Sequence, residues 1–190
     1  KPIRWRNRAV ADLYGPGSTL KVVTVAAGLN EGISPRAIIC NCAKKEQIKG
    51  SRISCVVHHP FYSGHGAVDM YKIIQHSCNI GAAHVGFRLG SKKLHAYDKA
   101  FGLLDPIDAG FGCEAVGRML PPEDWRLIRL ANVAFGQGIA VTPLQMAAVY
   151  GVIANDGVYT EPWFIKETRA ADGRVSKRQA RTSRRVVSPD

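Results

Sequence analysis

The sequence predicts an α+β domain, because helix patterns and strand patterns occur in separate stretches of the chain. Apolar residues at helical spacing, preceded by capping residues, recur between residues 18 and 153. Short β-branched runs occur at 37–40, at 51–57 and on both sides of Asp172-Gly173, a hairpin signal. With 190 residues and 46% apolar side chains, the chain can bury a substantial core, and it has no apolar run of membrane-spanning length.

The net charge of +11 is concentrated at the two ends of the chain. Residues 1–8 hold four basic side chains and no acid, and residues 166–185 hold eight basic side chains against two acids. The interior, 9–165, is nearly neutral, with fourteen basic and twelve acidic side chains. Because no basic helix carries interleaved aromatics, we expect no nucleic-acid partner. Solvated ends explain the charge best, and attraction to an anionic envelope surface comes second.

A turn at Gly15-Pro16-Gly17 precedes a helix that we expect over residues 18–29, ended by Asn30-Glu31-Gly32. Ser18 and Lys21 would lie one turn apart on this helix. A serine needs a neighbouring base to become a nucleophile, and a lysine can serve when burial lowers its pKa. The helix N-terminus would favour a developing oxyanion. The plainer alternative is a helix cap followed by a surface lysine.

The runs at 37–40 and 51–57 could pair as a hairpin, which would bring Cys55 opposite Cys40 or Cys42. Two histidines, His58 and His59, follow directly. These residue types can ligate a metal, but their spacing matches no zinc-finger pattern. Five cysteines in all leave three readings open: free or structural thiols, which we favour, then a disulfide, then a zinc site.

Three helices should follow, over 69–76, 80–89 and 91–101, the last capped by Ser91. Ser77-Cys78-Asn79 lies between the first two. The Ser77 hydroxyl could pass a proton between Lys21 and a leaving group, and the Asn79 amide could hold Lys21 and a substrate carbonyl. Alone, this triplet is equally well read as a capped turn between helices.

Residues 103–124 are rich in glycine and proline, which predicts loops, and the sequence does not decide the secondary structure of 125–134. Thr142 should cap a helix that runs to Ile153, with Pro143 first and Gln145 third in a capping box. Ser188-Pro189-Asp190 forms a further helix start with no helix behind it. We therefore expect the chain to stop partway through its fold.

The order Ser-x-x-Lys then Ser-x-Asn resembles the transpeptidase domain of class B, division-type penicillin-binding proteins. Other stretches add to the resemblance, which covers nearly the whole chain: Asn7-Arg8-Ala9-Val10, His76-Ser77-Cys78-Asn79-Ile80-Gly81, the run from Phe135 to Gln145, and Ile153-Ala154-Asn155-Asp156-Gly157. It implies the serine transpeptidase and β-lactamase-like fold, an antiparallel sheet flanked by helices. Residues 1–190 would form one partial transpeptidase domain, with 60–130 as a mainly helical subdomain.

The resemblance also implies a D,D-transpeptidase that crosslinks peptidoglycan stem peptides. Ser18 would attack the penultimate D-Ala carbonyl, Lys21 would act as base, Ser77 would relay the proton, and Asn79 would position Lys21 and the donor peptide. β-Lactams would acylate Ser18. No cofactor is needed, and no metal ligand is assigned.

Partners implied by the resemblance are stem peptides, β-lactam antibiotics and membrane proteins of division or elongation. The expected location is the extracytoplasmic face of the bacterial inner (cell) membrane, through an N-terminal anchor that these 190 residues do not include. Division and elongation roles are not distinguished by the sequence.

The sequence departs from the family pattern in three places. Neither Lys-Thr-Gly nor Lys-Ser-Gly, the third family motif, occurs in it, so we expect the chain alone to be a poor catalyst. Gly15 stands where acidic residues are common, and Cys78 places a thiol between Ser77 and Asn79, with its side chain expected to point away from the nucleophile. The alternatives are a β-lactamase or β-lactam sensor of the same fold and a non-catalytic division scaffold. The absence of an added carboxylate next to Ser77 argues against hydrolysis.

Overall fold

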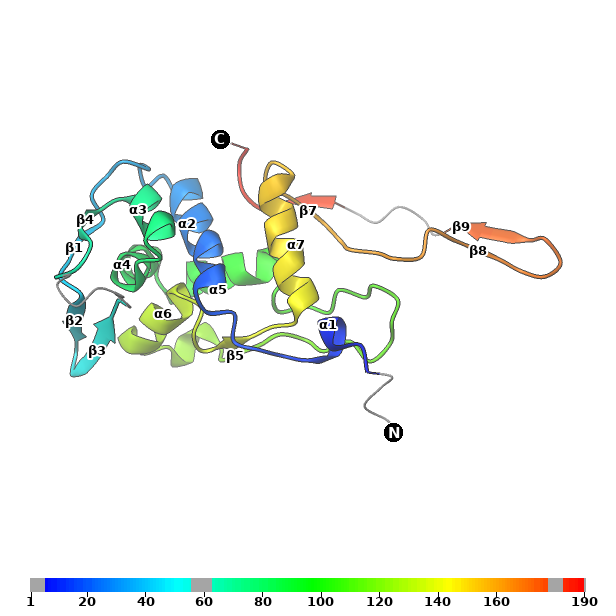
Figure 1. The fold of residues 1–190 in the computed structure, drawn as a ribbon, viewed down its shortest axis with the longest axis horizontal. Coiled ribbons are helices and arrows are strands. Elements are labelled where there is room, and N and C mark those ends of the chain that lie inside the picture. The colour runs from blue at the N-terminus through cyan, green and yellow to red at the C-terminus, as the bar shows by residue number, and fades with distance from the viewer. Residues whose placement is uncertain (1–5, 56–62, 178–182, 190) are drawn as a thin grey trace.

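The computed structural model describes residues 6–55, 63–177 and 183–189, and its helices gather around two hydrophobic cores. The helices are α1 (Arg8–Ala11), α2 (Lys21–Asn30), α3 (Met70–Gln75), α4 (Asn79–Leu89), α5 (Ser91–Ala100), α6 (Leu127–Ala134) and α7 (Pro143–Ala154), with 3-10 turns at Gly17–Leu20 and Pro122–Asp124. In Figure 1, α2, α4 and α6 lie on one side of the helical body, and α7 lies on the other.

Helix α4 is the centre of the first core, packed against α2, α3 and α6. Its small residues permit this close approach. A Cβ on Gly86 would lie 2.7 Å from the Ala134 Cβ, and one on Gly81 would lie 2.7 Å from the Ile73 Cγ1. The glycines of α4 are therefore packing residues.

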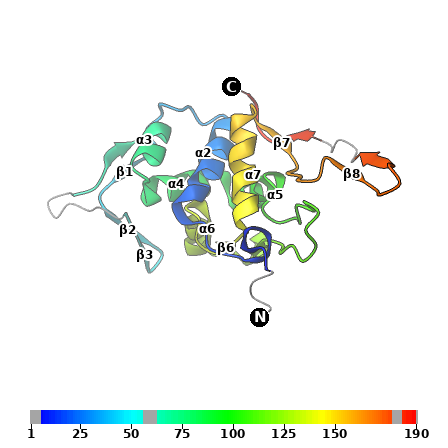
Figure 2. The same cartoon turned by 45° about the vertical axis from the view of Figure 1, so that its right-hand side comes forward.

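Helix α7 covers the second core, which also contains Leu20, Phe101 and Tyr159. Helix α2 contributes to both cores, with Val23 in the second and Val25 in the first. Figure 2 shows α2 and α7 side by side at the middle of the molecule. The catalytic candidates at the start of α2 thus stand where the two cores meet.

The strands of the described residues form five antiparallel pairs, each of two strands. They are β1 (Cys40–Cys42) with β4 (Gly66–Val68), β2 (Lys45–Ile48) with β3 (Ser51–Ser54), β5 (Arg118–Met119) with β6 (Ile139–Ala140), β7 (Val158–Thr160) with β10 (Ser183–Arg185), and β8 (Glu167–Arg169) with β9 (Val175–Lys177). The β8–β9 hairpin confirms the Asp172-Gly173 signal and extends away from the helices (Figure 1).

The possible pairing of 37–40 with 51–57 does not occur among the described residues of these two runs. Strand β3 pairs instead with β2, because Lys49 (φ 42°) and Gly50 (φ 85°) both adopt the positive φ of a two-residue hairpin turn. Strand β1 pairs with the distant β4, in the register Cys40 to Val68. The local turn at Lys49-Gly50 therefore decides the partner of β3, which the pattern of β-branched residues did not specify.

Helix boundaries follow the sequence expectations with small shifts. The segment before the Pro-Gly turn contains α1, capped by the Asn7 side chain, and then Tyr14 forms an isolated antiparallel bridge with Val141. The first turn after Gly17 is 3-10, so Ser18 precedes α2. Gly90 takes the N-cap position expected for Ser91, and residues 127–134 form α6. The Thr142–Gln145 capping box is confirmed.

Candidate active site

Lys21 is the centre of the candidate site. It is the first residue of α2 and is only 2% exposed. Its Nζ lies 2.9 Å from Ser18 Oγ, 2.9 Å from Ser77 Oγ, 2.7 Å from Ser77 O and 2.7 Å from Asn79 Oδ1. The structure thus brings together the four residues that the two sequence motifs singled out.

The turn before Ser18 is held by a second, distant segment. Gly17 adopts a positive φ of 57°, and its N–H donates to Gly136 O at 2.9 Å. Gly136 has φ 87°, and a Cβ there would lie 1.8 Å from Gly17 O. Only glycine at 136 allows this approach, so Gly136 positions the turn that carries the exposed Ser18 hydroxyl. The sequence showed a Gly-x-Gly at this place but no partner for it.

The second motif is built at the junction of α3 and α4. Ser77 has φ 51°, a strained value for a residue with a Cβ, and Cys78 is the N-cap of α4. Asn79 donates from Nδ2 to Ser54 O at 2.9 Å. Because this contact fixes which end of the amide is the donor, Oδ1 faces the Lys21 ammonium. Ser54 contributes only a main-chain carbonyl, which side-chain patterns could not reveal.

Burial lowers the pKa of Lys21 from its usual 10.5 to about 8. The negative charges of Cys55 and Cys78, where these thiols ionise, oppose this shift. None of the four oxygen atoms around Nζ belongs to a carboxylate, so they favour the ammonium only through neutral dipoles. At pH 7 about a tenth of the Lys21 side chains are neutral and able to accept a proton.

This arrangement can move protons between two hydroxyl groups. The Lys21 Nζ contacts both Ser18 Oγ and Ser77 Oγ, so a proton taken from one can be returned through the other. Ser18 is exposed, whereas Lys21 is buried beneath it. A buried base under an accessible hydroxyl is the geometry of an activated serine nucleophile.

Three of the cysteines and one histidine form a separate cluster beside the second motif. Cys42, Cys55, His65 and Cys78 bring their ligand atoms within 4.8 Å of one another. Cys55 therefore faces Cys42 rather than Cys40, and the Cys78 side chain packs into this cluster. A hydrogen bond from the Cys78 thiol lowers the pKa of Cys55 to about 5, whereas burial raises that of Cys40 to about 12. His58 and His59 lie outside the described residues.

The profile of the penicillin binding protein transpeptidase domain matches residues 1–190. Stage V sporulation protein D of Bacillus subtilis is 34% identical over 163 residues, covering 85% of this chain and 25% of that protein. PbpB of Mycolicibacterium smegmatis is 30% identical over 97% of this chain and 28% of that protein. Penicillin binding protein 3 of Mycobacterium tuberculosis, complexed with ampicillin, superimposes with a TM-score of 0.86 at 30% identity, over 96% of this chain and 40% of that one.

The fold and the paired serine motifs therefore define a serine transpeptidase domain. The chain belongs to the penicillin-binding protein transpeptidase family, within its class B group. It spans about a quarter of the length of the curated relatives named above. No helix among the described residues combines the length and apolarity that a membrane crossing requires.

Proposed function

We propose that the protein containing this chain is a peptidoglycan D,D-transpeptidase that works through an acyl-enzyme on Ser18. The observation that carries the proposal is the position of the Lys21 Nζ, buried and 2.9 Å from both the Ser18 and the Ser77 hydroxyl oxygen atoms. The names of two relatives support it: the M. smegmatis PbpA and the Caulobacter vibrioides FtsI relatives are described as a peptidoglycan D,D-transpeptidase and a probable one.

In the acylation step, neutral Lys21 takes the proton of Ser18 while Oγ attacks the carbonyl of the penultimate D-Ala. The tetrahedral intermediate then expels the terminal D-Ala, whose amine receives a proton from Ser77 Oγ. Lys21 returns its proton to Ser77, which closes the cycle. Each transfer crosses one hydrogen bond of the site or one contact with substrate.

Asn79 has two tasks in this mechanism. Its Oδ1 holds the Lys21 Nζ at 2.7 Å, and its Nδ2 is anchored on Ser54 O. We assign the second Nδ2 hydrogen to a carbonyl of the donor peptide. The amide would thus align the base and the substrate at the same time.

In the second half-reaction, an amine on a neighbouring stem peptide attacks the acyl-enzyme and forms the crosslink. A β-lactam would acylate Ser18 by the same route and remain attached. The third family motif does not occur in these residues, so we assign turnover to the longer protein, with 1–190 as part of its transpeptidase domain and 60–130 as a helical subdomain. We further infer an extracytoplasmic, membrane-anchored enzyme that works with division or elongation proteins.

Labelling with a fluorescent penicillin tests the proposal, using this chain and a chain extended through the rest of the domain. The extended form should be labelled, and Ser18→Ala should abolish the label. Ser176→Ala, on the exposed strand β9, is the matched control and should be labelled normally. Labelling that survives Ser18→Ala would refute the nucleophile, and rapid release of the label would indicate a β-lactamase instead.

A further inference from the structure

We propose that Cys42, Cys55, His65 and Cys78 bind one zinc ion in a closed structural site beside the second serine motif. The four residues come from separate segments: the end of β1, the residue after β3, the approach to β4 and the N-cap of α4. Cys42, Cys55 and Cys78 are 1%, 4% and 0% exposed, and His65 is partly buried. This proposal takes up the zinc reading that the sequence left open as the third of three, in place of no assigned metal ligand.

The spacing of the four ligand atoms fits a tetrahedral zinc ion. Zinc–sulfur bonds of about 2.3 Å and zinc–nitrogen bonds of about 2.0 Å place two sulfur atoms about 3.8 Å apart and sulfur and nitrogen about 3.5 Å apart. The Cys42–Cys55 and Cys55–Cys78 Sγ distances are both 3.6 Å, and Cys42 Sγ lies 3.5 Å from His65 Nδ1. All pairs lie within 4.8 Å, so one ion can reach every ligand.

The donor set also selects the metal. Three thiolates and one imidazole are typical of closed structural zinc sites, whereas hard cations such as Mg²⁺ and Ca²⁺ prefer oxygen ligands. In the bound state all three cysteines are thiolates, with any remaining thiol protons released to solvent, and the imidazole binds as the neutral ring through Nδ1. The site then carries one net negative charge.

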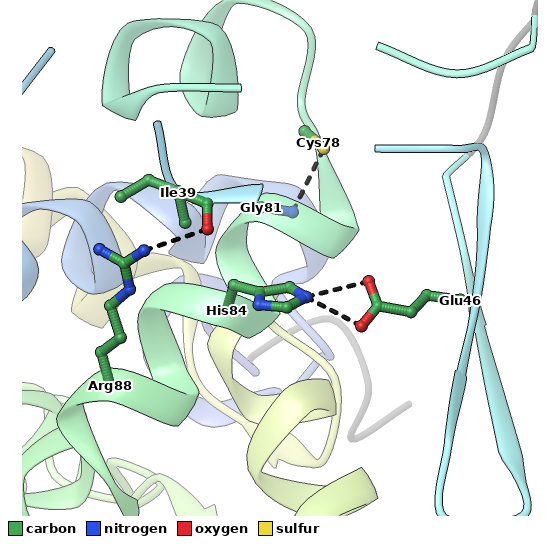
Figure 3. A network of polar contacts seen from close by, with 6 residues as sticks. All are labelled: Ile39, Glu46, Cys78, Gly81, His84 and Arg88. Carbon is green, nitrogen blue, oxygen red and sulfur yellow. Dashed lines mark hydrogen bonds and ion pairs between the residues drawn. The ribbon is translucent and has the colours of Figure 1, made fainter. Parts of the chain in front are cut away.

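Contacts around the cluster hold the ligands in place. The Gly81 N–H donates to Cys78 Sγ at 3.3 Å, and the His76 ring stacks on His65 with the centroids 5.3 Å apart. Farther along α4, His84 Nε2 lies 2.9 Å from both Glu46 carboxylate oxygen atoms, and Arg88 donates to Ile39 O (Figure 3). These contacts tie α4 to β2 and to the residue before β1, and β2 pairs with β3, the strand that Cys55 follows. Such outer contacts orient ligands in zinc sites.

The ion would reinforce the contact that orients Asn79. Cys55 follows Ser54, whose carbonyl accepts from Asn79 Nδ2, and Cys78 precedes Asn79. Zinc would bridge these two segments from the buried side. We therefore assign the four ligands a positioning role toward Ser77 and Asn79. This positioning role rests on the proposed function, whereas zinc binding does not.

Metal content tests the site without reference to activity. The intact protein, purified under reducing conditions, should contain one zinc ion per chain by native mass spectrometry and elemental analysis. Cys113 is exposed and should react readily with a thiol reagent, and half-buried Cys40, with its raised pKa, should react slowly. The other three cysteines should react only after a chelator releases the zinc. Failure to bind zinc after incubation with ZnCl₂, or a disulfide among the three cysteines in the reduced preparation, would overturn the proposal.

Ligand variants test the site further, and a Co²⁺ spectrum of the wild-type protein tests it even if the variants do not fold. Cys42→Ser and His65→Ala should lose zinc, whereas Cys40→Ser, outside the cluster, should retain it. Wild-type protein loaded with Co²⁺ should show the visible and charge-transfer bands of a tetrahedral cobalt thiolate. An octahedral cobalt spectrum without sulfur charge-transfer bands would refute the ligand set, even if every variant unfolds.

Acylation kinetics test the positioning role. Removal of zinc from the wild-type protein should slow fluorescent-penicillin acylation by about 10–100-fold, and zinc should restore the rate. Unchanged acylation by the zinc-free protein would refute the positioning role and leave the zinc site intact. If no form is ever acylated, the proposed function fails, and the zinc measurement still decides the site.

Discussion

Lys21 is a buried amine whose charge is poorly compensated, and this is why we propose it as the base. Its Nζ contacts hydroxyl, carbonyl and amide oxygen atoms, so desolvation outweighs their attraction and lowers the pKa to about 8. A carboxylate in the same place would hold the lysine charged at neutral pH. In the proposed mechanism, Lys21 can act as the base because the groups that contact its Nζ directly are neutral.

This pKa predicts the pH dependence of acylation in the extended protein. Deprotonation creates the active base, so the second-order rate of penicillin acylation should rise about tenfold per pH unit up to about pH 8 and level off above it. Stopped-flow measurement between pH 6 and pH 10 checks the profile. A rate that is flat from pH 6 to pH 8 would contradict Lys21 as the base.

Replacing Lys21 by methionine should separate catalysis from stability. Lys21→Met should lower the acylation rate by about 10³-fold, because no base remains at Ser18. The free energy of unfolding should change by less than about 2 kcal/mol, because removal of a buried charge offsets the lost hydrogen bonds. Lys92→Met, exposed on α5, is the control and should leave both quantities unchanged. Near-normal acylation by Lys21→Met would exclude the proposed role.

The residues of the site were foreseeable where side chains carry the signal. Ser18, Lys21, Ser77 and Asn79 stand in two short motifs, and helical spacing placed the first pair on one face. Gly136, Ser54 and His65 were missed. Gly136 acts through a close approach of two distant backbones, Ser54 acts through a carbonyl, and His65 reaches the cluster through the path of the chain between β3 and β4. The partner of each of these groups lies far away in the chain, and no pattern along the sequence specifies it.

At the scale of the element, turns and caps with local chemistry were predictable and strand partners were not. The Thr142–Gln145 box and the Asp172-Gly173 hairpin depend on neighbours in sequence, and both are confirmed. The β1–β4 pair joins residues far apart in the chain, and nothing in the 37–40 run specifies its partner. Lys-Gly is not among the strong two-residue turn signals, so the sequence did not predict that Lys49-Gly50 joins β2 to β3.

The contact between the Gly17 turn and Gly136 is sensitive to a single substitution. Gly136→Ala would place a Cβ 1.8 Å from Gly17 O at a positive φ, so we expect a loss of about 2–4 kcal/mol in the free energy of unfolding and slower acylation. Gly173→Ala is the matched control, since it has a similar φ of 84° with open space around its Cβ, and should cost about 1 kcal/mol. Urea unfolding measures both. Equal losses would show that backbone strain alone matters.

On the scale of the whole molecule, α2 ties the two cores together. Val23 and Val25 lie two residues apart, and each is buried in a different core. The fold class was predictable because helix caps and hairpin turns are specified by residues that are close in sequence. The division into two cores was not predictable, because it depends on which elements pack against each face of α2. Disruption of the packing in one core should therefore also destabilise the other.

This arrangement predicts one cooperative unfolding transition for the described body. Amide hydrogen exchange in α4, at the centre of the first core, and in α7, over the second, should report the same free energy of opening within about 1 kcal/mol. Amides of the β8–β9 hairpin, which projects from the body, should exchange at far lower free energy and serve as the internal control. A much lower value for α7 than for α4 would show that the cores unfold separately.

The Ser54–Asn79 hydrogen bond has a consequence for how mutations at this site would be tolerated. Asn79 contacts the main chain of position 54, not its hydroxyl group, so the contact survives almost any side chain there. Asn79 cannot be replaced in the same way, because its amide must donate to Ser54 O and accept from the Lys21 Nζ. In deep mutational scanning, most substitutions of Ser54 should therefore have little effect, whereas most substitutions of Asn79 should abolish activity. In the proposed mechanism the contact needs both residues, but only Asn79 supplies it through its side chain.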